Sequence, residues 1–169
     1  MTIQTGTPTS TGIQVVVDVA DFAVAGGDSV LVTLGLGSCV ALALHDPATG
    51  IAGLAHILLP TVGTNPPSIR AAKYADTAVP MLVEEMRRHG ARRKLVAKMA
   101  GGARMFAALL PSGINMGERN IEATRAALAK LGIKIIGEDV GGEYGRSVKF
   151  FAATGAMTVR SLVGGNRDL

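Results

Sequence analysis

The sequence contains only one cysteine, Cys39, and no tryptophan in 169 residues. A single thiol excludes a disulfide within the chain and a zinc site built from several thiolates. Histidines and carboxylates show no metal-ligand spacing either, so we expect neither a metal nor another cofactor. Aromatic residues make up only 4% of the chain. The core must therefore be built from aliphatic side chains, alanine and methionine.

Long apolar runs and targeting signals are also scarce. The run Ile51–Leu59 is far shorter than the ~20 residues that a membrane-spanning helix needs. Residues 1–12 are rich in Thr, Gly and Ser, and they lack the basic segment and apolar core of a signal peptide. We therefore expect a soluble, cytoplasmic protein that does not insert into membranes.

The formal net charge is +4 at pH 7, but the basic residues are not arranged for nucleic acid. The densest basic stretch, Arg87–Lys94, falls at the expected end of a helix, where cations favour the helix dipole. No aromatic residues that stack on bases are interleaved with it, so we expect no nucleic-acid partner. Hydrophobic residues make up 48% of the chain, which argues against intrinsic disorder and suits one globular domain.

Periodicity and turn residues predict short strands and two helices. We expect strands over residues 13–19, 30–36, 40–44, 51–59, 94–99, 133–140, 147–152 and 157–162. The first helix is expected from an N-cap at Ser68 to His89, with a kink or break at Pro80. The second is expected over residues 117–131, and Gly132 ends it.

Apolar side chains recur on one side of each helix, which predicts two buried helix faces. They are Tyr74, Ala75, Ala78, Leu82 and Met86 in the first, and Ile121, Thr124, Leu128 and Leu131 in the second. Because strands do not alternate regularly with helices, a Rossmann-type sheet is not expected. The sequence predicts a single-domain, layered α/β sandwich with a mostly antiparallel or mixed sheet. We expect residues 1–12 to be a flexible leader, 13–163 the folded domain and 164–169 a loose tail.

Cys39 follows Gly37-Ser38, where one expected strand ends and the next begins. Glycine permits a tight turn there that leaves the thiol uncovered. His56 lies in the neighbouring strand, and Thr33 lies in the strand that enters the turn. These residues suit a nucleophile, a base and an orienting hydroxyl. The alternative is that Cys39 and His56 are simply two core residues, because spacing alone does not set their geometry.

The chemistry of such a group is acyl transfer. An ordinary thiol has a pKa of about 8.5, and a neighbouring imidazolium is expected to lower it and supply thiolate. The thiolate would attack a carboxamide carbon, and backbone N–H groups around Ser38 and Cys39 would hold the oxyanion. The pattern Gly35-Leu36-Gly37 is not a dinucleotide motif, because the third glycine is absent at Val40.

Several separate motifs resemble the CheD family, in the same order along the chain. They are residues 34–40, 53–60, 73–76, 98–103 and 115–120, followed by Gly141-Gly142 and Gly145-Arg146. The resemblance spans about residues 13–162. It implies an α/β sandwich fold and deamidation of glutamines in the cytoplasmic region of chemoreceptors, with release of ammonia. Cys39 matches the family's nucleophile, His56 its histidine and Thr33 its third polar residue.

Further roles are expected around these three residues. The candidates for contacts with the substrate or its oxyanion are Gly37, Ser38, Gly102, Arg119 and Asn120, and Arg146 is a further candidate for the substrate groove. The resemblance also implies a possible partner, a CheC-type phosphatase. Two alternatives stay open. The chain is a binding module for that phosphatase or for receptors, with Cys39 merely buried, or it is another thiol hydrolase such as an esterase or thioesterase.

Overall fold

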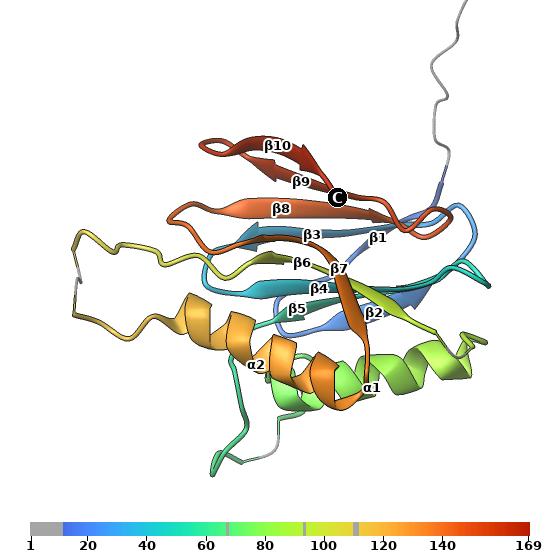
Figure 1. Ribbon diagram of the computed structural model, residues 1–169, viewed down its shortest axis with the longest axis horizontal. Coiled ribbons are helices and arrows are strands. Elements are labelled where there is room, and N and C mark those ends of the chain that lie inside the picture. The colour runs from blue at the N-terminus through green and yellow to red at the C-terminus, as the bar shows by residue number, and fades with distance from the viewer. Residues whose placement is uncertain (1–11, 67, 93, 110–111) are drawn as a thin grey trace, which may run out of the picture.

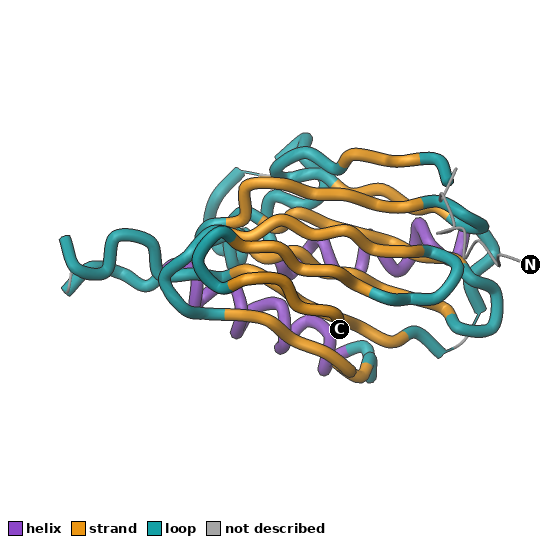
Figure 2. The backbone as a smooth tube through the Cα atoms, turned by 90° about the horizontal axis from the view of Figure 1, so that it is seen from above, coloured by secondary structure: helices purple, strands orange, loops and turns teal. Residues whose placement is uncertain are grey.

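The computed structural model of the chain describes residues 12–66, 68–92, 94–109 and 112–169, so most of the expected leader lies outside the described residues (Figure 1). Two five-stranded sheets pack face to face, and two helices cover the outer face of one of them. Figure 2 shows the strands of the upper layer with the helices beneath. The predicted single-domain α/β sandwich is confirmed.

The sheet that contacts the helices, called the central sheet here, has the order β2-β5-β4-β6-β7, and the other, called the outer sheet, has the order β1-β3-β8-β9-β10. Both are mixed, because β1–β3 and β6–β7 are parallel and the remaining pairs antiparallel. The central strands are β2 (Phe22–Ala25), β4 (Val40–Asp46), β5 (Ile51–Ile57), β6 (Val96–Gly101) and β7 (Lys134–Val140). The outer strands are β1 (Gln14–Val16), β3 (Val30–Leu36), β8 (Arg146–Phe151), β9 (Met157–Ser161) and β10 (Gly165–Asp168).

Strand β4 explains how the layers meet. All seven of its residues are buried, as expected for a strand with both faces covered. Val40, Leu42 and Leu44 pack into the core shared with the helices. Ala41 and Ala43 point the other way, into the core between the sheets. Small side chains on that face let the two sheets approach closely.

The helices are α1 (Ala75–Arg88) and α2 (Met116–Lys130). Every residue predicted for the inner face of the first helix is buried, and so are Ile121, Thr124 and Leu128 of the second. Leu131 is the exception, at 47% exposed, because it lies at the C-cap, past the last helical turn. Asn115 caps α2, since its side-chain oxygen accepts a hydrogen bond from Glu118 N.

Helix α1 begins later than the sequence predicts. Ser68 does not cap it but accepts a hydrogen bond from Arg70 N within a loop. Residues 69–73 form bends and a turn, and Tyr74 at the N-cap is extended because Leu59 bonds on both sides of it, donating to Lys73 O and accepting from Ala75 N. Of the kink or break predicted at Pro80, the break does not occur: the proline removes one helical donor, but the helix continues through it.

Two strands were not predicted from the sequence. Residues 22–25 form β2, which pairs with β5. Residues 165–168, expected to be a loose tail, form β10 and pair with β9. Both segments are four residues long, too short to show a clear period. Within the described residues, neither helix is long and apolar enough to cross a membrane.

Candidate active site

The candidate site lies where the chain crosses from one sheet to the other. Strand β3 ends at Leu36 in the outer sheet, and residues 37–39 turn into β4 of the central sheet (Figure 1). We call residues 37–39 the crossover turn. Thr33 comes from β3, Cys39 from this turn and His56 from β5. The site is therefore assembled from both sheets.

The register of β4 and β5 puts Cys39 and His56 on the same side of neighbouring chain segments, with no hydrogen bond between the thiol and His56 Nε2. Ala41 pairs directly with His56, so the two side chains share a face of the sheet. Cys39 is two residues before Ala41 and packs in the same core between the sheets. In a regular sheet, such diagonal neighbours have Cβ atoms about 7 Å apart, within reach of longer side chains. The thiol and imidazole thus lie on the same side of adjacent strands.

Thr33 fixes the state of the imidazole ring. Its Oγ1 donates a hydrogen bond to Val17 O at 2.7 Å and lies 2.7 Å from His56 Nδ1. A hydroxyl has one proton, and here that proton goes to the carbonyl. The Thr33 oxygen must therefore accept from His56, which puts the neutral ring's proton on Nδ1. His56 Nε2 is left as an unprotonated base, buried and without a hydrogen-bond partner among the described residues.

Burial sets the charge state of the pair. Thr33 and His56 are fully buried, and Cys39 is 9% exposed. Burial raises the pKa of the Cys39 thiol, against a smaller opposite effect of its own backbone N–H. Burial also lowers the pKa of His56, partly offset by the carboxylate of Asp18. The sequence predicted an imidazolium that lowers the thiol pKa. In the free protein, loss of hydration instead favours a neutral thiol beside a neutral imidazole.

Neighbouring groups hold all three carbonyls of the crossover turn. Gly37 O accepts from Ala103 N at 2.9 Å, and Cys39 O accepts from Gly102 N at 2.8 Å. Ser38 O accepts from Asn120 Nδ2 at 2.8 Å. The N–H groups of Ser38 and Cys39 have no acceptor on another described residue. They therefore remain available to a ligand at the thiol.

These bonds bear on two residues that the sequence suggested for substrate or oxyanion contacts. Asn120 is fully buried, and its amide donates to Ser38 O and to Leu58 O at 3.1 Å. Its two N–H donors are therefore used within the protein rather than free for an oxyanion. The N–H of Gly102 is likewise bound to Cys39 O. Gly37 and Ser38 are half-buried in the turn itself, and Arg119 is exposed on α2.

Two glycines permit the close packing around the turn. Gly101 has φ +101°, and a Cβ there would overlap Cys39 O. Gly117, in the first turn of α2, would with a Cβ overlap the carbonyl oxygens of Gly102 and Ala103. Larger residues would push β6 or α2 away from the crossover turn. The glycines thus let the helix carrying Asn120 approach the loop that carries Cys39.

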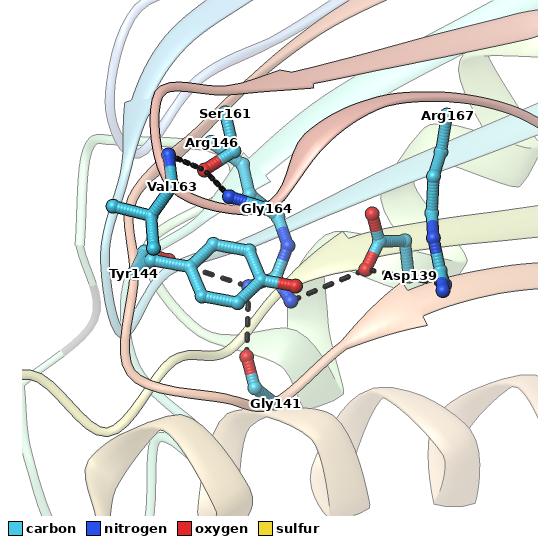
Figure 3. A network of polar contacts seen from close by, with 8 residues as sticks. All are labelled: Asp139, Gly141, Tyr144, Arg146, Ser161, Val163, Gly164 and Arg167. Atoms are coloured by element: carbon cyan, nitrogen blue, oxygen red, sulfur yellow. Dashed lines mark hydrogen bonds and ion pairs between the residues drawn. The ribbon is translucent and has the colours of Figure 1, made fainter.

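Arg146 belongs to a structural network beside this region (Figure 3). Its guanidinium is buried, pairs with Asp139 at 3.2 Å and donates to Gly141 O at 2.8 Å. The ring of Tyr144 lies 4.3 Å from its central carbon. The sequence suggested Arg146 for the substrate groove. Its guanidinium holds the turn between β7 and β8, and the residue also lines the hollow described next.

A hollow of about 710 Å³ lies between the end of β3, the turn before β8 and the hairpin of β9 and β10. Its walls include Gly35, Met105 and the hairpin residues Leu162 and Val163. The side chain of Met105 also covers the α-carbon of Gly37, 3.2 Å from where a Cβ would stand. The lining also includes the charged residues Glu143, Arg146 and Arg160, and it does not include Cys39.

Sequence reasoning missed three groups that shape the site. Val17 contributes a backbone carbonyl, and Ala103 contributes a backbone N–H. Nearly every residue carries the same backbone N–H and C=O groups, so the residue type does not show which of them contribute to the site. Asp18 influences His56 through its charge. Its only sequence signal is a lone carboxylate near the end of the expected strand over residues 13–19.

Comparisons with known proteins agree on one family. The family model described as CheD chemotactic sensory transduction matches residues 58–161. A relative from Archaeoglobus fulgidus, named probable chemoreceptor glutamine deamidase CheD, is 47% identical over 155 residues, covering 91% of this chain and 97% of the relative. The chemoreceptor glutamine deamidase CheD of Thermotoga maritima is 44% identical over 153 residues, covering 90% and 94%. The family model begins after His56, whereas matches of this length span the region from Thr33 to His56.

Proposed function

Because the chain belongs to the CheD family, we propose that it is a chemoreceptor glutamine deamidase with Cys39 as nucleophile, His56 as base and Thr33 as the orienting residue. The observation that carries this proposal is the hydrogen bond between Thr33 and His56 Nδ1. It leaves the lone pair of Nε2 free, on the face of the sheet that also carries Cys39. That is the tautomer a general base needs.

The first half of the reaction is acylation. His56 Nε2 takes the proton of Cys39 as the sulfur attacks the carboxamide carbon of a glutamine side chain. The carbonyl oxygen becomes an oxyanion, and the N–H groups of Ser38 and Cys39 stabilise it. Each well-placed donor of this kind is worth about 3 kcal/mol of barrier. The imidazolium then gives its proton to the departing nitrogen, which leaves as ammonia, and a thioester remains on Cys39.

The second half is hydrolysis. His56, neutral again, takes a proton from a water molecule, whose oxygen attacks the thioester carbon. The carbon–sulfur bond breaks, and the imidazolium returns its proton to the sulfur. The net change is one glutamine and one water converted to one glutamate and one ammonium ion. No metal, redox partner or external cofactor is needed to balance these steps.

The substrate is the cytoplasmic helical region of a chemoreceptor, and the protein acts in the cytoplasm. Each turnover replaces a neutral amide by a carboxylate on a helix, which alters repulsion between neighbouring charges and biases a two-state receptor. A CheC-type phosphatase is the second partner that family membership suggests. It would bind the folded protein without entering the chemistry.

The test uses the purified protein and the cytoplasmic domain of a chemoreceptor. Incubation should release ammonia and raise the mass of a receptor peptide by about 1 Da, as amide-to-acid chemistry requires. Cys39→Ala should abolish both signals while leaving the thermal transition intact. His56→Ala should be nearly as inactive, because it removes the base.

Three results would count against the proposal. Deamidation by Cys39→Ala would exclude a thiol nucleophile. A wild-type protein that binds the receptor domain but never changes its mass would favour a binding module. Hydrolysis of small thioesters or esters without any effect on receptor glutamines would point to a different acyl substrate for the same three residues.

A further inference from the structure

Asn120 joins the two chain segments that flank the candidate site. It lies in α2, yet its side-chain amide donates to Ser38 O at 2.8 Å and to Leu58 O at 3.1 Å. Ser38 immediately precedes Cys39, and Leu58 lies two residues after His56. One rigid amide group therefore sets the spacing between the crossover turn and the end of β5.

The hydrogen bond to Ser38 O comes from a side chain, unlike the bonds to the carbonyls of Gly37 and Cys39. The carbonyls of Gly37 and Cys39 are held by backbone N–H groups, which every substitution except proline keeps. Ser38 O is held by a side chain. Its peptide unit also contains the N–H of Cys39, a proposed oxyanion donor. The orientation of that donor therefore depends on Asn120.

Asn120 is kept in this place at a cost to the fold. Its Oδ1 is buried without a hydrogen-bond partner among the described residues. An unsatisfied buried acceptor opposes folding. A residue chosen only for packing on this helix face would be apolar, like Ile121 and Leu128 nearby. The polar side chain is explained if its two donated bonds serve the site.

We propose that Asn120 is a positioning residue of the deamidase: it aligns the N–H donor at Cys39 and fixes the distance between the segments that carry Cys39 and His56. This inference rests on the proposed function. Asn120 does not touch the substrate, so its loss acts on the chemical step rather than on binding. A misplacement of about 1 Å in such a site costs up to about 10²-fold in rate.

The experiment compares wild type, Asn120→Ala, Asn120→Ser and Leu128→Ala. Leu128 is buried on the same helix but packs in the core away from the crossover turn, so its variant controls for lost stability. Steady-state deamidation is measured per folded molecule. The rate of iodoacetamide alkylation is measured against pH, and it reports Cys39 alone because the chain has one cysteine.

Asn120→Ala should lower kcat by about 10- to 100-fold with KM changed less than about twofold. It should also shift the alkylation profile of Cys39. Asn120→Ser, whose shorter hydroxyl reaches at most one of the carbonyls, should change both quantities in the same direction. Leu128→Ala should lower the melting temperature but keep the wild-type kcat and alkylation profile.

Wild-type kcat and alkylation in folded Asn120→Ala would overturn the inference. So would failure of both Asn120 variants to fold, since the residue would then be structural. Alkylation needs no receptor, so these outcomes are separable from the proposed function. A wild type without deamidase activity contradicts that function, whatever the Asn120 variants do.

Discussion

At the scale of single residues, one proton on Thr33 decides what His56 can do. Because the hydroxyl donates to Val17 O, its oxygen accepts from Nδ1 and leaves Nε2 as the base. Thr33→Val keeps the shape but removes both bonds. We expect kcat to fall by up to about 10²-fold, the lower range of what a general base contributes. Steady-state ammonia release measures this.

Thr33→Ser is the matched control, because it keeps the hydroxyl and should keep most of the activity. The valine variant also buries an Nδ1–H without an acceptor, which costs about 1–3 kcal/mol of unfolding free energy. Activity must therefore be compared per folded molecule. Equal kcat for Thr33→Val and wild type would contradict the role of the hydroxyl.

The depressed pKa of His56 predicts how stability depends on pH. Burial lowers this pKa below its ordinary 6.5, so the unfolded chain takes up the proton at higher pH than the folded protein. The stability that depends on the neutral ring is fully present above 6.5 and is lost as pH falls from there to the folded pKa. Urea unfolding between about pH 7 and pH 5 should show this loss.

His56→Gln supplies the comparison, since it does not titrate. Its unfolding free energy should fall less over the same pH window than that of wild type. The acid limb of kcat/KM should likewise lie below the ordinary imidazole pKa, because the base stays neutral to lower pH. Parallel stability curves for the two proteins would show that His56 is not the titrating group.

At the scale of elements, the first turn of α2 must touch the loop after β6. A Cβ on Gly117 would overlap two backbone carbonyls there. Gly117→Ala gains helix propensity of up to about 1 kcal/mol, but overpacking costs about 1–3 kcal/mol. We expect a lower melting temperature and a lower kcat, because the helix that carries Asn120 moves away from the crossover turn.

Gly26→Ala is the control for that experiment. A Cβ at Gly26 would make only ordinary contacts, at 3.7 Å and beyond. This variant should keep both the melting temperature and kcat of wild type. If Gly117→Ala also kept the wild-type melting temperature and kcat, the close contact between α2 and the loop after β6 would not be needed for stability or activity.

Elements with a strong period could be predicted from the sequence, whereas those fixed by distant partners could not. The inner face of α1 follows from the spacing of Ala78, Leu82 and Met86. Its start does not, because Leu59 holds the backbone around Tyr74 extended. Strand β10 exists through its pairing with β9, and no local signal in residues 165–168 reveals that partner.

The same division applies to the site. Cys39, His56 and Thr33 were predicted from residue type and family resemblance, and the structure places Thr33 and His56 in hydrogen-bond contact. The sequence did not reveal that both N–H donors of Asn120 are used by the carbonyls of Ser38 and Leu58. Sequence names the side chains that carry chemistry, but it does not show which backbone groups they serve.

At the scale of the whole molecule, one lysine links the two sheets. Lys98 projects from β6 of the central sheet, and its ammonium donates to Gly155 O at 2.6 Å and Leu169 O at 2.7 Å. Gly155 lies between β8 and β9 of the outer sheet. Lys98→Met keeps the length of the side chain but not its donors. We expect a loss of about 1–3 kcal/mol in unfolding free energy, measured by urea denaturation.

Lys134→Met is the matched control, because Lys134 is exposed on β7 of the same sheet. Its loss should change stability by less than about 0.5 kcal/mol. Hydrogen exchange should also quicken in β9 and β10 of Lys98→Met and not of Lys134→Met. Equal stability of the two variants would mean that Lys98 adds nothing to the contact between the sheets.

The crossover turn has a consequence for how the protein loses activity. Thr33 belongs to the outer sheet and His56 to the central sheet, so the proposed catalytic group exists only while the two sheets stay packed together. Mild heat or denaturant that loosens the contact between the two sheets would abolish deamidation while circular dichroism still reports intact strands and helices. The deamidation rate would then report the packing of the two sheets more sensitively than circular dichroism, which reports only secondary structure.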